Sequence, residues 1–177
     1  MVKSDYLFTS ESVSEGHPDK VCDRISDAVL DHFMTADPIN SRLGCETFCT
    51  TNRIIVGGEG RCVEPVVKNG EIDKEAIEAI ARSCVKEIGY EQAGFHWKNA
   101  DTQVYLHAQS ADIAQGVDAA GNKDEGAGDQ GLMFGFACDE SERFPGLEGT
   151  YMPLSALLSL RLTRKLSEVR ENGTLPW

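Results

Sequence analysis

No basic excess, no long apolar run and no C-x-x-C pair occurs in this sequence of 177 residues. Its 17 Lys and Arg residues stand against 29 Asp and Glu residues, so the formal net charge is −12. A protein that binds duplex nucleic acid normally carries a basic face, so we expect no nucleic-acid partner. An anionic ligand would need cations, divalent metals or helix ends placed locally.

The absence of a long apolar stretch also indicates where in the cell the protein is expected. Residues 1–8 include a lysine, a serine and an aspartate, which is not typical of a signal peptide. We therefore expect no membrane partner and a cytoplasmic location by default.

The spacing of cysteine and histidine argues against a zinc or redox site. We expect structural thiols in a reducing compartment rather than disulfides. The six cysteines are Cys22, Cys45, Cys49, Cys62, Cys84 and Cys138. His32, His96 and His107 have no second histidine at ligand spacing, so we interpret them as structural or surface residues.

Three segments repeat apolar residues at the spacing of an amphipathic helix. The first runs from Pro18 until Asp37 and Pro38, the second covers about residues 73–88, and the third covers about residues 153–171. We predict that each apolar stripe packs into the core. On the third helix these residues are Leu154, Leu157, Leu158, Leu162, Leu166 and Val169.

Four shorter segments are strand candidates. Residues 46–51 and 53–57 predict a hairpin that turns near Asn52, residues 101–108 alternate with a period of two, and residues 132–138 form a short apolar run. This mixed order of strands and helices predicts an α+β fold with an antiparallel or mixed sheet.

Residues 115–131 differ from the rest of the chain because they contain five glycines and four acids. Their only sizeable apolar residue is Val117, so the segment cannot bury much apolar area. Loops of this length are usually functional or disordered. Composition alone leaves a lid and plain disorder as equal alternatives.

The strongest local signal is Gly16-His17-Pro18-Asp19-Lys20, at the start of the first predicted helix. The free N–H groups and the dipole of a helix start attract phosphate. His17 and Lys20 could donate hydrogen bonds or charge to it, and Asp19 could hold a divalent metal. The alternative is an ordinary capped helix with solvated side chains, and the motif by itself leaves both open.

Three further acids have the same ambiguity. Glu46 lies in a predicted strand, Glu59 follows two glycines, and Asp129 lies among several glycines. Glycines let a ligand approach closely, so each carboxylate could bind a cation or an amino group. Exposed charges at strand ends are the alternative.

Together these segments resemble the methionine adenosyltransferases, also called S-adenosylmethionine synthetases. FTSESVSEGHPDK at residues 8–20 and GAGDQGLMFG at residues 126–135 are similar to the two long signatures of that family. The shorter VGGE, EIGY and NGTLPW also match in order. The resemblance implies a two-layer β/α sandwich with mixed or antiparallel sheets and helices on one face. It also implies an amino-terminal region over residues 1–112, a gating loop over 113–131 and the beginning of a central region over 132–177.

The resemblance implies that methionine sulfur attacks the ribose C5′ of ATP, and that the expelled triphosphate is hydrolysed to phosphate and diphosphate. His17 would be the catalytic residue that stabilises the leaving oxygen, and His17 and Lys20 would bind ATP. Asp19 would bind Mg²⁺, with two ions per site, and Glu46 would be associated with K⁺.

Glu59, Gln115 and Asp129 match the methionine-binding positions of the family. The gate would include Gln115, Gly116, Val117, Asp118, Gly121, Asp124 and Glu125. Family active sites lie between subunits, so the resemblance implies a homodimer or a dimer of dimers.

Family members continue past Trp177 and bring further cationic residues to the nucleotide. We therefore expect a truncated chain that is inactive alone. The alternative is a non-catalytic regulatory or interaction chain that retains the dimer surface.

Overall fold

The computed structural model describes residues 7–109 and 131–175. The chain divides into two compact units. One is Gly16–Gln130, and the other combines Met1–Glu15 with Gly131–Trp177.

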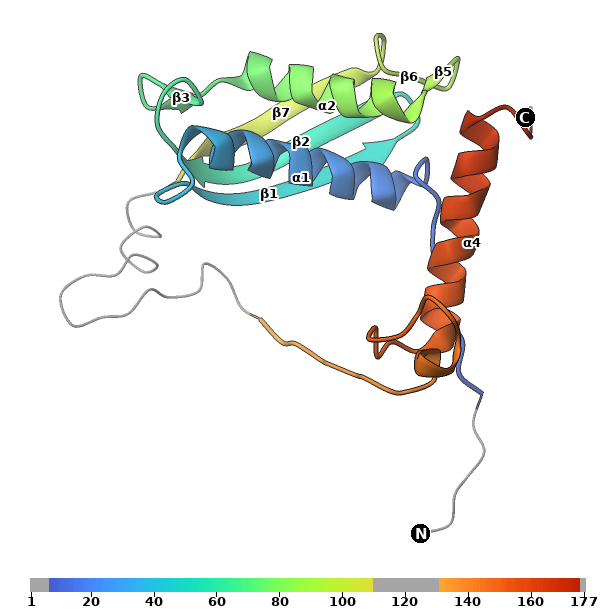
Figure 1. The fold of residues 1–177 in the computed structure, drawn as a ribbon. Coiled ribbons are helices and arrows are strands. Elements are labelled where there is room, and N and C mark those ends of the chain that lie inside the picture. Colours follow the sequence, from blue (N-terminus) through green and yellow to red (C-terminus); the bar gives the residue numbers. More distant parts are fainter. Residues whose placement is uncertain (1–6, 110–130, 176–177) are drawn as a thin grey trace, which may run out of the picture. The chain divides into compact units, whose positions relative to one another are not determined.

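A three-stranded sheet covered by two helices forms the Gly16–Gln130 unit (Figure 1). The strand order is β1 (Arg42–Thr50), β2 (Arg53–Arg61) and β7 (Asp101–Ala108), with β1 antiparallel and β7 parallel to β2. Helices α1 (Pro18–Ala36) and α2 (Lys74–Ile88) lie on the same face of this sheet. The expected α+β fold, with a mixed sheet and helices on one face, is confirmed.

The residues next to α2 determine where this helix begins and ends. Asp73 caps α2 by accepting a hydrogen bond from the Ala76 N–H at 3.2 Å. Gly89 ends α2 with a φ of 95°, a left-handed conformation that glycine adopts without strain. Both helices have the bounds that their apolar spacing predicted, to within one residue.

The core of this unit lies between the helices and the sheet. Helix α1 contributes one residue per turn, and the sheet contributes side chains from β2 and β7. The fully buried side chains include Val21, Ile25, Val29, Phe33, Ile54, Val56, Ile77, Val85 and Leu106. This burial fixes which face of α1 and which face of the sheet meet.

Gly60 on β2 is needed for that packing. A Cβ added there would lie 2.7 Å from Cε1 of Phe33 and 3.0 Å from Cδ1 of Leu43. These distances are too short for two carbon atoms that are not bonded. The Phe33 ring therefore occupies the space that a side chain at residue 60 would need.

Two strands are longer than predicted, and four short strands were not predicted. Strands β1 and β2 are longer than the predicted hairpin, which does turn at Asn52. Two unpredicted ribbons pair β3 (Val67–Lys68) with β4 (Glu71–Ile72) and β5 (Glu91–Gln92) with β6 (Phe95–His96). The first turns at Asn69-Gly70, where both φ angles are positive. Asn-Gly is the usual signal for a two-residue hairpin turn.

In the second unit, residues 7–15 run beside α4 (Leu154–Glu171). The hydroxyl oxygens of Ser10 and Ser155 lie 3.1 Å apart, those of Ser12 and Thr163 lie 3.2 Å apart, and Arg170 forms an ion pair with Glu15. A short 3-10 helix, η1 (Ser141–Arg143), precedes α4. None of the helices in the described ranges is long and apolar enough to cross a membrane.

Two predictions for this unit are wrong. No residue of α4 is buried, and Leu162 on its predicted inward stripe is 70% exposed. Residues 132–138 form no strand, and Met133 and Phe134 are about nine-tenths exposed. A buried stripe needs another element to cover it, and a strand needs a paired neighbour. Within the described residues of this unit, residues 7–15 cover α4 only in part, and residues 132–138 do not pair as a strand.

We predict that Gly60→Ala lowers the free energy of unfolding by about 1–3 kcal/mol, the usual cost of overfilling a packed core. The new methyl group would press on Phe33 and Leu43. Urea unfolding followed by circular dichroism measures the change.

Gly57→Ala is the matched control in the same strand. Both substitutions restrict the unfolded chain equally, but a Cβ at Gly57 would meet only the Tyr105 Cβ at 3.9 Å. Equal stability of the two variants would contradict the role given to the Phe33–Gly60 contact.

Candidate functional site

The first part of the candidate site is the start of α1. His17 is the N-cap residue, and its Nδ1 accepts a hydrogen bond from the Asp19 N–H at 3.2 Å. Its carbonyl accepts the first helical bond, from the Val21 N–H at 2.9 Å. Because a backbone N–H can only donate, Nδ1 carries no proton in the neutral ring, and Nε2 carries it. His17 therefore offers an N–H donor at the positive end of a helix.

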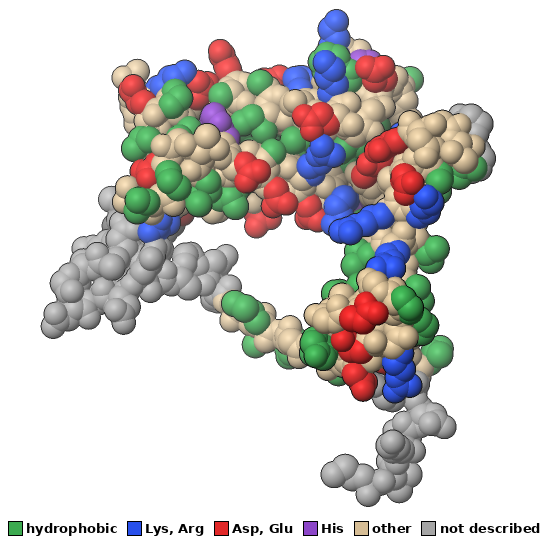
Figure 2. All heavy atoms as spheres, in the orientation of Figure 1, with side chains coloured by type: hydrophobic (Ala, Val, Ile, Leu, Met, Phe, Trp, Pro, Cys, Tyr) green, Lys and Arg blue, Asp and Glu red, His purple; other side chains and the backbone are tan. Residues whose placement is uncertain are grey.

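Charged side chains of both signs surround this helix start. Asp19 is 84% exposed, with its Oδ2 3.8 Å from the His17 Nδ1, and Lys20 pairs with Asp23 at 3.3 Å. Figure 2 shows acidic side chains spread over one face of the Gly16–Gln130 unit with basic side chains between them. An anion would thus meet positive charge at the helix start rather than over a broad basic surface.

Within the described ranges, no three His, Cys, Asp or Glu side chains gather closely enough to hold a metal ion. A lone exposed carboxylate such as Asp19 still fits Mg²⁺, which is often held by one or two carboxylates together with substrate phosphates and water. The donor set therefore suits a metal that arrives with a polyphosphate and does not suit a permanent protein cage.

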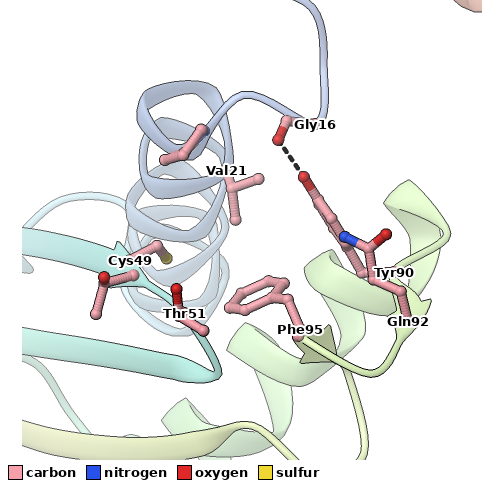
Figure 3. Close-up of a pocket in the computed structure, with 10 residues that line it drawn as sticks. Gly16, Val21, Cys49, Thr51, Tyr90, Gln92 and Phe95 are labelled. Carbon is pink, nitrogen blue, oxygen red and sulfur yellow. Dashed lines mark hydrogen bonds between the residues drawn. The ribbon is translucent and has the colours of Figure 1, made fainter.

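A cavity of about 440 Å³ opens beside the same helix start (Figure 3). Its walls come from the first turn of α1, from Thr50 at the end of β1 with the following Thr51, and from the β5–β6 ribbon with Gln92 and Phe95. The sequence did not predict this cavity, because its walls are far apart along the chain.

Cys49 lines that cavity and is half-buried. Burial raises the pKa of the Cys49 thiol well above its ordinary value, and a hydrogen bond with the Cys22 thiol raises it further. Burial also raises the pKa of Cys22, Cys45 and Cys84. All six cysteines are free thiols, and these four are poorly suited to act as nucleophiles.

The second part of the candidate site lies on the other face of the sheet. Thr47 points toward the helices, because its hydroxyl lies 2.8 Å from that of Ser26 on α1. Glu46 is the neighbour of Thr47 and therefore points away. Glu46 is paired with Gly57, so Glu59, two residues further on, shares its face. The fold thus places Glu46 and Glu59 together but on a different face from α1.

Small and ring side chains surround these two acids. Glu59 is half-buried and has Gly44 on one side and His107 on the other in the strand register. A Cβ added to Gly44 would meet the backbone oxygen of Glu59 at 4.0 Å. Phe48 and Tyr105 on the same face are 59% and 61% exposed. In the sequence, His107 has no second histidine at ligand spacing. The strand register, which the sequence did not predict, brings it beside Glu59.

The remaining predicted site residues lie outside the described residues. These are Gln115 and Asp129 and the whole predicted gate, Gly116, Val117, Asp118, Gly121, Asp124 and Glu125.

We predict that native Cys49 reacts with iodoacetamide far more slowly than the same cysteine in urea at about pH 8. The thiolate is the reactive form, and a raised pKa keeps the thiol protonated until the pH is higher. The native rate should therefore increase as the pH rises. Mass spectrometry of the Cys49 peptide measures it, and equal native and unfolded rates would contradict the burial of this thiol.

Comparison with known proteins places these observations in a family. A sequence model of the S-adenosylmethionine synthetase N-terminal domain matches residues 5–111, and one of the central domain matches residues 124–177. The S-adenosylmethionine synthases of Parvibaculum lavamentivorans and Rhodospirillum centenum are 57% and 54% identical over 99% and 100% of this chain. The chain covers 42% of each of these relatives, so it spans about two fifths of their length. On these matches, the chain belongs to the S-adenosylmethionine synthetase family.

Proposed function

We propose that this chain supplies the amino-terminal part of a site that makes S-adenosylmethionine from ATP and L-methionine, with release of phosphate and diphosphate. The observation that carries the proposal is the α1 start, where the Nδ1 of His17 caps the helix and leaves Nε2–H as a donor beside Lys20. The relatives are named S-adenosylmethionine synthase, which supports S-adenosylmethionine as the product.

The chemistry needs alignment and charge stabilisation more than a strong base. Methionine sulfur is already a good nucleophile, and the barrier lies in orienting it toward C5′ and in the charge that develops on the leaving oxygen. His17 donates a hydrogen bond to that oxygen, and the free N–H groups of the α1 start and the Lys20 ammonium bind the triphosphate.

Two kinds of metal ion belong to the proposal. Asp19 holds Mg²⁺, two ions per site, and Glu46 is associated with K⁺. Bound Mg²⁺ neutralises charge on the triphosphate and makes it a better leaving group. The exposed Asp19 carboxylate next to the helix start supports this assignment, because phosphate and metal can reach it together.

We assign methionine binding to Glu59, Gln115 and Asp129, with residues 113–131 as the gate over the site. Gly44, which lies opposite Glu59 in the strand register and has no side chain, supports binding of an ammonium group by the Glu59 carboxylate. We also propose the division into residues 1–112, 113–131 and 132–177. The change of unit between Gln130 and Gly131 supports its second boundary, whereas residues 1–15 group with residues 131–177.

Within the described residues of the Gly16–Gln130 unit, no helix lies on the sheet face opposite α1 and α2. This opposite sheet face supports assembly with a second copy as a homodimer or a dimer of dimers. Exposed Phe48 and Tyr105 lie there beside Glu46 and Glu59, so a second subunit covering them would bury apolar area and enclose the acids. The free thiols support a cytoplasmic location.

We predict that His17→Asn and His17→Ala both slow sulfonium formation by about 100-fold in a catalytically competent form of the protein, the usual effect of removing one such donor. Asparagine can still cap α1, whereas alanine also loses about 1 kcal/mol of capping. Single-turnover kinetics and thermal unfolding separate the two effects. An unchanged rate of sulfonium formation in His17→Asn would show that the His17 ring does not act on the leaving oxygen.

The alternative is a non-catalytic regulatory or interaction chain that retains the dimer surface. Because the chain spans about two fifths of its relatives, we predict no measurable product when the 177 residues alone receive ATP, methionine, Mg²⁺ and K⁺. Robust product formation would overturn this prediction. A change in the rate of a complete synthase on mixing with the chain would favour the alternative.

A further inference from the structure

The ring of Tyr90 is held firmly at the end of α2. Its N–H donates to the Val85 carbonyl at 3.2 Å, and its own carbonyl accepts from the Trp97 N–H at 3.0 Å. The ring packs edge-on against Phe95, with 5.0 Å between ring centroids and 84° between the planes. These contacts leave the phenol hydroxyl in a fixed place at the wall of the cavity (Figure 3).

That hydroxyl donates a hydrogen bond to the carbonyl of Gly16, 74 residues away in the sequence. Gly16 is the first residue of the Gly16–Gln130 unit and directly precedes the N-cap residue His17. A Cβ added to Gly16 would lie 3.1 Å from the Tyr90 hydroxyl oxygen, so the approach depends on the missing side chain.

We propose that Tyr90 is a positioning residue for His17: by holding the Gly16 carbonyl, its hydroxyl fixes the peptide from which the His17 ring is presented. The ring orientation then has two supports, the Nδ1 bond to the Asp19 N–H on one side and the Tyr90 bond on the other. A donor must be placed to a fraction of an ångström to act on a developing charge, so loss of either support misaligns Nε2–H. This inference rests on the proposed role of His17.

Tyr90→Phe tests the inference because it keeps the ring packed on Phe95 and removes only the hydroxyl. In the 177-residue chain, we expect the Gly16 carbonyl and the His17 ring resonances to shift, while the methyl resonances of the buried Val56 and Leu106 stay in place. In a catalytically competent form, we expect kcat to fall about tenfold with the KM for methionine unchanged. Glu59, which we assign to methionine, lies on the other face of the sheet.

Tyr151→Phe is the matched control, since it removes the hydroxyl of an exposed tyrosine in the other unit. It should change neither the His17 resonances nor kcat. Gly16→Ala disturbs the same contact, because its new methyl group would crowd the Tyr90 hydroxyl, and it should also lower kcat. Adding Gly16→Ala to Tyr90→Phe should lower kcat little further, because the oxygen that crowds the new methyl group is gone.

The outcomes separate this inference from the proposed function. If His17→Asn slows the reaction but Tyr90→Phe leaves kcat unchanged, the positioning role is wrong and the role of His17 stands. If neither variant changes kcat, the proposed role of His17 is wrong, and the positioning role of Tyr90 that rests on it is wrong too. Unchanged Gly16 and His17 resonances in Tyr90→Phe would overturn the inference without any activity measurement.

Discussion

The packing of α1 against the sheet is the constraint on which the candidate site depends. Val21, Ile25, Val29 and Phe33 are buried at helical spacing, so only one face of α1 can meet the sheet. Gly60 provides the space for Phe33 and thereby sets how closely helix and strand approach. The direction of α1 follows from these contacts. Its amino-terminal end, with His17, is therefore placed by side chains that take no part in chemistry.

One strand serves both the core and the candidate site. Successive residues of β2 point to opposite faces, so Val56 is buried under the helices while Glu59 lies on the face opposite them. A shift of one residue in the register would exchange these roles and put a carboxylate in the core. The same burial that stabilises the unit thus determines which face carries Glu46 and Glu59.

The second unit shows where local sequence signals are insufficient. Helix α4 forms with the predicted bounds, but its apolar stripe is not buried, and residues 132–138 carry apolar side chains without pairing as a strand. Backbone hydrogen bonds within a helix need no partner, whereas a strand needs a neighbour to accept and donate. The helix could therefore be predicted correctly from local sequence and the strand could not.

The sequence by itself determined the three helices, the hairpin at Asn52, the α+β class and the family, since these depend on local spacing and on ordered motifs. It also singled out the helix start at His17 as a place for phosphate. Only the tertiary structure decided that Glu46 and Glu59 share a face, that His107 lies beside Glu59, and that Tyr90 bonds to Gly16. Such contacts join residues far apart in the chain, and no local periodicity specifies them, because they arise only after the core has brought the strands and helices together.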